Sequence, residues 1–72
     1  MGKNYYLTLH GIENSISHLI VHNAVYLPRK GELIQELGED YKVIQVVHKF
    51  RSIDEDSNKR EVLETIVIAE IF

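Results

Sequence analysis

The fold of this chain is decided by residues 27–50, which read LPRKGELIQELGEDYKVIQVVHKF. Pro28–Gly31 predicts a tight turn, because proline presets the backbone for an early turn position and glycine accepts positive φ. A short strand over Leu33–Leu37 and a hairpin connection at Gly38–Asp40 follow. Tyr41–Phe50 then reads as a long strand with apolar side chains on both faces, which is typical of a central strand. Strands separated by tight turns predict a small, strongly curved sheet.

Period-two alternation divides the side chains of this long strand between the two faces of the sheet. The sequence predicts Tyr41, Val43 and Val47 on one face, and Lys42, Ile44, Val46, His48 and Phe50 on the other.

Further strands are predicted on both sides of this stretch. Asn4–His10 alternates and contains aromatic and other β-preferring residues. Ile16–Leu27 is rich in β-branched residues, and its interruption at Asn23–Ala24 predicts a bulge or a bend. A helix over Ser15–Ala24 is the alternative, since some of its apolar residues also lie at helical spacing. Glu61–Phe72 closes the chain as a strand with apolar residues on both faces.

These elements predict one all-β domain over residues 1–72, either a small five-stranded antiparallel SH3-like barrel or a strongly curved sheet. A chain of 72 residues buries only roughly 60% of its unfolded surface, so its core is modest. The absence of cysteine excludes disulfides and thiolate metal sites as a source of stability. We therefore expect a homodimer or a larger homo-oligomer.

The net charge and the absence of targeting patterns limit the kinds of partner and the cellular location that we expect. The formal net charge is −3 and the pI is about 5.7, which argues against broad binding to nucleic acid or to anionic membranes. The N-terminal residues lack the apolar core of a signal peptide, and no apolar run approaches membrane-spanning length. The sequence predicts a cytoplasmic protein without a membrane partner.

The chain resembles a group of small bacterial and phage-borne proteins that share two motifs. The first is a turn of the form L-P-x-x-G-[DE], matched by Leu27–Glu32. The second is a strand of the form [YW]-x-V-x-x-V, matched by Tyr41–Val46. The resemblance covers about a third of the chain and implies an SH3-like sheet and an origin on a phage or another mobile element. It carries no catalytic residue.

Catalysis and metal binding are not expected. No phosphate-binding loop, dinucleotide fingerprint or nucleophile elbow occurs, and paired carboxylates are confined to the charged loop Arg51–Arg60. His18 and His22 are four apart, which on a strand separates them by roughly 13 Å and prevents chelation by the pair alone. We predict a non-enzymatic protein without a cofactor or a metal.

The charged loop opens like a calcium-binding loop, with Asp54, Asp56 and Asn58 in the pattern D-x-D-x-N. Lys59 stands where such a loop needs glycine, and Thr65 stands where it needs a bidentate glutamate. The loop is therefore interpreted as a solvated connection.

Binding of a protein partner is the predicted function, in the manner of an accessory or inhibitor protein that acts on a host protein. The predicted protein-binding residues are Tyr41, His48, Phe50 and Arg51, together with the loop that follows them. A nucleic-acid-binding barrel is the alternative, because cations interleaved with aromatic rings can hold a single strand. Its predicted residues are Arg29, Lys30, Lys42 and Lys49. A small-molecule-sequestering oligomer is the third hypothesis.

Overall fold

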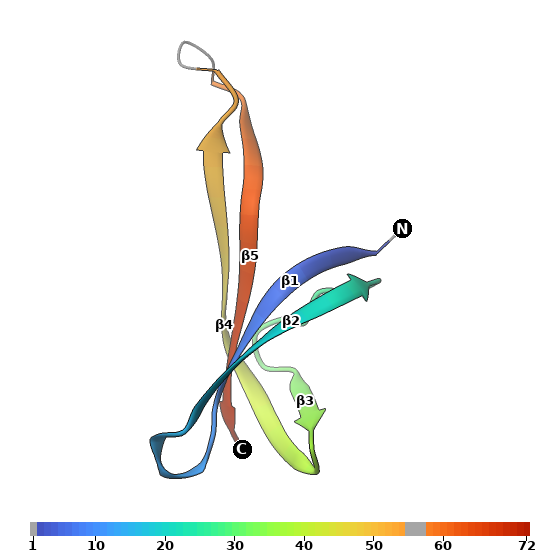
Figure 1. The fold of residues 1–72 in the computed structure, drawn as a ribbon, viewed down its shortest axis with the longest axis vertical. Coiled ribbons are helices and arrows are strands. Elements are labelled where there is room, and N and C mark those ends of the chain that lie inside the picture. Colours follow the sequence, from blue (N-terminus) through green and yellow to red (C-terminus); the bar gives the residue numbers. More distant parts are fainter. Residues whose placement is uncertain (1, 55–57) are drawn as a thin grey trace.

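The computed structural model describes residues 2–54 and 58–72. The chain forms five strands and one turn of 3-10 helix (Figure 1). In chain order they are β1 (Lys3–His10), η1 (Ile12–Asn14), β2 (Ile16–Ala24), β3 (Leu33–Glu36), β4 (Glu39–Ser52) and β5 (Arg60–Ile71).

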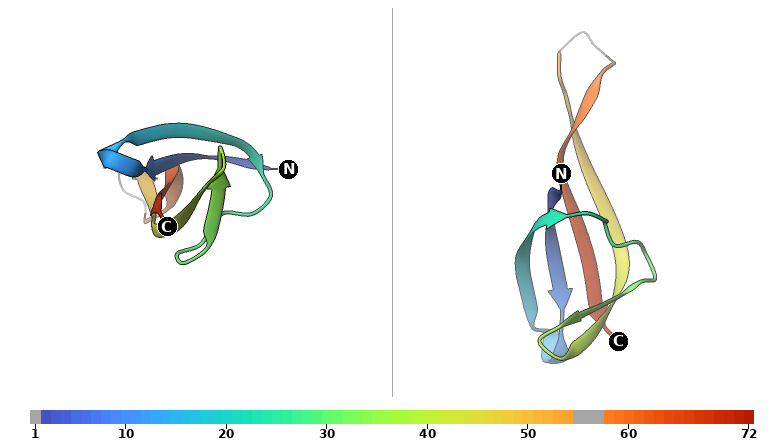
Figure 2. Two further views of the ribbon diagram at one scale, coloured as in Figure 1. Left: turned by 90° about the horizontal axis from the view of Figure 1, so that it is seen from below. Right: turned by 90° about the vertical axis from the view of Figure 1, so that its right-hand side faces the viewer.

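The five strands form one sheet in the order β2-β1-β5-β4-β3. β1 and β5 run parallel, whereas the other three pairs are antiparallel, so the sheet is mixed. The sheet curls strongly into a half-barrel, which confirms the predicted all-β, strongly curved fold (Figure 2). Ser15–Ala24 lies in β2 and its approach, so the strand prediction is confirmed there and the helical alternative is wrong.

The core lies on the concave face of this sheet. Strands β1, β4 and β5 carry its six buried side chains, which are Tyr5, Leu7, Leu9, Val43, Val67 and Ala69. Pairing in register explains their contact, since Leu7 lies opposite Val67 and Ala69 lies next to both Leu9 and Val43. The connection between β2 and β3 crosses the open side, where Leu27 packs against the core (Figure 2).

β4 and β5 continue past the rest of the sheet as a two-stranded ribbon (Figure 1). β1 pairs with β5 only at residues 66–70, and β3 pairs with β4 only at residues 39–42. We call residues 48–54 and 58–65 the arm, and the remainder of the described chain the base. Two ion pairs join the strands of the arm, Lys49–Glu64 at 3.0 Å and Arg51–Glu61. The arm makes the molecule elongated, with extents of 47 × 27 × 19 Å.

Backbone irregularities lie near the predicted positions. Asn23 has a φ of 55°, and the register between β1 and β2 shifts beside it, so the predicted irregularity is confirmed. The turn after Pro28 is closed by the Glu32 N–H, which donates to the Arg29 carbonyl at 3.0 Å, with Gly31 at a φ of 94°. The next turn consists of Leu37 and Gly38, since β3 ends at Glu36 and β4 begins at Glu39. The predicted connection at Gly38–Asp40 therefore begins and ends one or two residues earlier.

The predicted division of faces in the long strand is wrong beyond Val43. The register passes from Val43 opposite Ala69 to Gln45 opposite Ile68, which leaves Ile44 as an extra residue in a bulge. The bulge reverses the alternation that follows it. Val46 and His48 therefore share the concave face with Tyr41 and Val43, whereas Val47 and Lys49 lie on the convex face.

Candidate functional site

Large apolar side chains are exposed along the arm. Phe50, Val62 and Leu63 are between 55% and 59% exposed, and Ile53 follows at the end of β4 with 58%. Phe50 and Val62 are direct cross-strand partners, so they form one apolar surface instead of two isolated side chains. A contiguous exposed apolar surface on a small protein marks an interaction site.

A groove of about 650 Å³ lies where the arm meets the base, and we call it the arm-base groove. Its apolar lining comes from Tyr5, Val25 and Leu27 of the base and from Val62 and Leu63 of the arm. Tyr5 also belongs to the core, so the floor of this groove is the rigid part of the molecule. Burial raises the pKa of the Tyr5 hydroxyl from its ordinary value of 10.0.

A second groove of about 910 Å³ separates the β2–β3 connection from β4. Residues 25–30 and Glu32 line one side, and residues 44–46 and His48 line the other. Val25, Leu27 and His48 line both grooves, so these three residues lie at their junction. His48 is held there by its Nδ1 atom, which lies 3.2 Å from the Thr65 hydroxyl across the strand pair.

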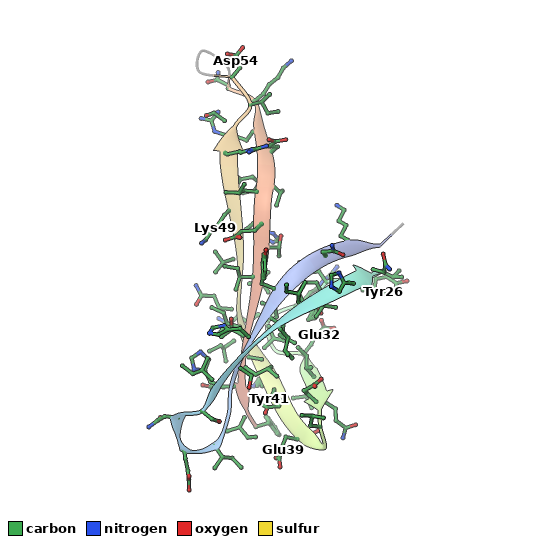
Figure 3. The ribbon with its side chains drawn as sticks, in the orientation of Figure 1. Tyr26, Glu32, Glu39, Tyr41, Lys49 and Asp54 are labelled. Carbon is green, nitrogen blue, oxygen red and sulfur yellow. The ribbon has the colours of Figure 1, made fainter. Side chains whose placement is uncertain are left out.

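The structure places two of the four residues predicted to bind a protein, His48 and Phe50, on one face of the arm. Arg51 follows Phe50 on the opposite face, where its guanidinium pairs with Glu61. Tyr41 lies apart from them, since seven residues of strand separate it from His48 by roughly 23 Å. Figure 3 shows Tyr41 on the lower part of the molecule, while Lys49 lies on the arm. Tyr41 is half-buried against the core.

The residues predicted to bind nucleic acid are divided between two faces. Arg29 and Lys30 line the second groove on the concave side. Lys42 and Lys49 flank buried or concave-facing residues of β4 and therefore lie on the convex face. There Lys49 pairs with Glu64, and the Lys42 ammonium lies 6.0 Å from the centre of the Phe72 ring. The four cations form no common stripe in the described chain.

Metal-binding geometry is also absent from the part of the chain that the structure describes. Over residues 2–54 and 58–72, no three side chains of histidine, aspartate or glutamate come together to hold an ion. His18 lies on β2, where its Nδ1 atom is 3.3 Å from the Thr8 hydroxyl. Asp56, a member of the calcium-like pattern, lies outside the described residues. Within the described segments no helix is long and apolar enough to span a membrane.

Sequence reasoning missed the other half of the site. The sequence predicts Val62 and Leu63 in the strand Glu61–Phe72 and Val25 in the strand Ile16–Leu27, which the structure ends at Ala24, and it names none of the three as a binding residue. Their meeting depends on the register of the β4–β5 pair and on the path of the β2–β3 connection. The usable signal was distance from the connection between β4 and β5. Phe50 and Val62 each lie two residues from Ser52 and Arg60, the last pair of the hairpin, and are therefore opposite each other.

Comparisons with protein families, with curated proteins and with solved structures found no match for this chain. The resemblance to small phage-borne proteins therefore stays a prediction that depends on the two turn and strand motifs alone.

Proposed function

We propose that this chain is a non-enzymatic protein-interaction module that seats an apolar segment of a partner protein in the arm-base groove. The observation that carries the proposal is the exposed cross-strand pair Phe50 and Val62, of which Val62 lines a groove that also reaches the core residue Tyr5. Aromatic and aliphatic side chains around a pocket are the usual energetic centre of a protein interface.

The geometry suits a partner side chain that inserts between the arm and the base. Complete burial of a side chain such as Phe50 or Val62 contributes about 1.5–3 kcal/mol each. The floor costs little to organise, since Tyr5 and Leu27 already pack in the core. The adjacent cross-strand pair, Arg51 and Glu61, lies on the opposite face of the ribbon and keeps that face polar.

The biological setting belongs to the same proposal. The L-P-x-x-G-E turn of residues 27–32 supports an accessory or inhibitor protein carried by a phage or another mobile element. The partner is then a host protein, met in the cytoplasm, where a chain without cysteine loses nothing to reducing conditions.

Site-specific photo-crosslinking in the producing cell tests the proposal. A photoreactive amino acid in place of Phe50 should capture a discrete partner, whereas the same group in place of Ile12 should not. Ile12 is a matched control because it is 60% exposed and lies in the loop between β1 and β2. The captured protein is then purified and titrated against the unmodified module.

Val62→Ser should weaken that complex at least tenfold, which corresponds to about 1.4 kcal/mol, while Ile12→Ser should leave its affinity unchanged. Equal capture from positions 50 and 12, or equal affinities of the two serine variants, would contradict the proposed site.

A further inference from the structure

The outer edge of β2 differs from every other free strand edge in the described chain. β2 spans nine residues, reads ISHLIVHNA, and contains no proline and no lysine, arginine, aspartate or glutamate. It is the first strand in the sheet order, so no strand of the described chain pairs with its outer edge. Its backbone donors and acceptors on that side are available to another strand.

The other unpaired edges are charged, short or, at residues 44–48 of β4, faced by the β2–β3 connection. β3, at the opposite end of the sheet, has only four residues and includes Glu36. The free edge of β4 in the arm includes Lys49 and Arg51, and that of β5 includes Glu61 and Glu64. Charged or short edges are a common protection against edge-to-edge association, and β2 lacks that protection.

We propose that β2 pairs antiparallel with β2 of a second copy across a twofold axis, so that the two half-barrels share one continuous sheet. The regular part of the edge is residues 16–22, because Asn23 has a φ of 55° and the register breaks beside it. A twofold axis at Leu19 uses this entire segment. The contact is isologous and closes after two copies.

This register places Leu19 against Leu19 of the second copy at the axis and opposes no like charges elsewhere. Residues at equal distances from Leu19 lie on the same face, since side chains alternate with a period of two. On the concave side Leu19 meets Leu19 of the second copy, and Ser17 meets Val21 of that copy. On the convex side Ile20 meets His18 of the second copy. No formal charges of like sign oppose one another anywhere in this segment.

The convex face adds a second reason for a copy of this chain as the occupant. Four apolar side chains lie side by side across four strands, Ile20 on β2, Tyr6 on β1, Ile66 on β5 and Val47 on β4. Three of these side chains, Tyr6, Ile20 and Ile66, line a groove of about 500 Å³ together with Thr8, His18 and Glu64. Pairing at β2 brings the apolar rows of the two copies together at one seam. A charged strand of another protein would find no complementary charge on this edge.

The mass in solution at micromolar to millimolar concentration tests the pairing. Sedimentation equilibrium of the unmodified chain should give twice the monomer mass of 8.4 kDa. Ile20→Glu should give the monomer, because two introduced carboxylates would lie close to the axis. Leu33→Glu is the matched control, since Leu33 is 58% exposed against 57% for Ile20 and lies on the convex side of β3, the opposite outer strand. It should remain dimeric.

A single-cysteine experiment tests the register without weakening the dimer. The described chain has no cysteine, so Leu19→Cys introduces one reactive thiol per copy. Mild oxidation should crosslink Leu19→Cys rapidly and Leu33→Cys slowly. Leu19 is on the concave side, so a dimer formed by contact of two convex faces would leave its variant uncrosslinked and would overturn the proposal.

A monomeric unmodified chain, or an Ile20→Glu variant that remains dimeric, would overturn it equally. The inference does not depend on the arm-base groove, which lies away from residues 16–22. Val62→Ser should lose the partner and keep the dimer, whereas Ile20→Glu should lose the dimer while its sheet spectrum in circular dichroism stays unchanged.

Discussion

Strands β4 and β5 run through both the base and the arm, yet their side chains are buried in the base and exposed in the arm. In the base, β4 and β5 contribute Val43, Val67 and Ala69 to the core, with exposures of 1% or less. In the arm, the same strands have no buried residue, and Phe50 and Val62 are more than half exposed. The difference arises because β1 pairs with β5 only at residues 66–70 and β3 pairs with β4 only at residues 39–42, so no third strand of the described chain pairs with the arm.

This contrast separates the source of stability from the source of binding. A two-stranded ribbon alone is marginally stable in water, so the arm depends on the base for its shape. Its two ion pairs are solvent-exposed, and such pairs contribute about 0–1 kcal/mol each. We therefore expect substitutions in the base to change the free energy of unfolding and substitutions in the arm to change binding.

The largest expected effect is the loss of a core side chain. Leu9→Ala should lower the free energy of unfolding by about 2–5 kcal/mol, because Leu9 is 2% exposed and its removal leaves a cavity. Domains of this size have only about 4–11 kcal/mol in total, so the variant should be partly unfolded. Urea denaturation measures the change. Val62→Ala is the control and should stay within about 0.5 kcal/mol of the parent. Equal losses from both variants would remove the distinction between base and arm.

The next largest effect is expected at Gly2, where β1 approaches the end of β2. A Cβ atom on Gly2 would clash with the backbone of Asn23, which a side-chain rotation cannot relieve. Gly2→Ala should cost about 1–3 kcal/mol. Gly11→Ala is the matched control, since its Cβ would meet only the Ser15 hydroxyl, at 2.7 Å, which can rotate away. Thermal unfolding compares the two variants, and a larger loss from Gly11→Ala would contradict the packing described here.

A gain of stability is expected from the β3–β4 turn. Leu37 and Gly38 both have positive φ, 49° and 82°, which is the pattern of a two-residue turn that favours Asn-Gly. Leu37 is 93% exposed, so its side chain contributes little to packing. Leu37→Asn should stabilise the base by about 1 kcal/mol and leave partner affinity unchanged. A fall in the urea midpoint would show that Leu37 has a contact role that its exposure does not indicate.

The smallest expected effect concerns the arm itself. Glu64→Gln removes one member of the Lys49–Glu64 pair and should cost less than about 1 kcal/mol. The loss should shrink further as salt rises, since the pair is exposed and screened. Denaturation at low and high ionic strength measures it. A loss as large as that of Leu9→Ala would mean that the arm supports the base.

The sequence predicted the number and type of the elements because alternation and turn residues are local signals. The turn at residues 28–31 and the irregularity at Asn23 were both recognisable from proline, glycine and asparagine. The inversion of faces after Ile44 was not, since a bulge depends on the pairing of β4 with β5 and leaves no mark in the alternation. The candidate site shows the same division between local signals and features that depend on strand pairing. His48, Phe50 and Arg51 were found as neighbours in one strand, whereas Val62 and Val25 required the tertiary arrangement.

Amide hydrogen exchange followed by NMR tests the division between base and arm most directly. The amides of Leu7, Val43 and Val67 should exchange only through global unfolding, because they lie in the buried centre of the sheet. The ladder amides of residues 49–52 and 60–63 should exchange far faster, through local opening of the arm. Equal protection in the two regions would show that base and arm unfold as one unit, and would contradict this account.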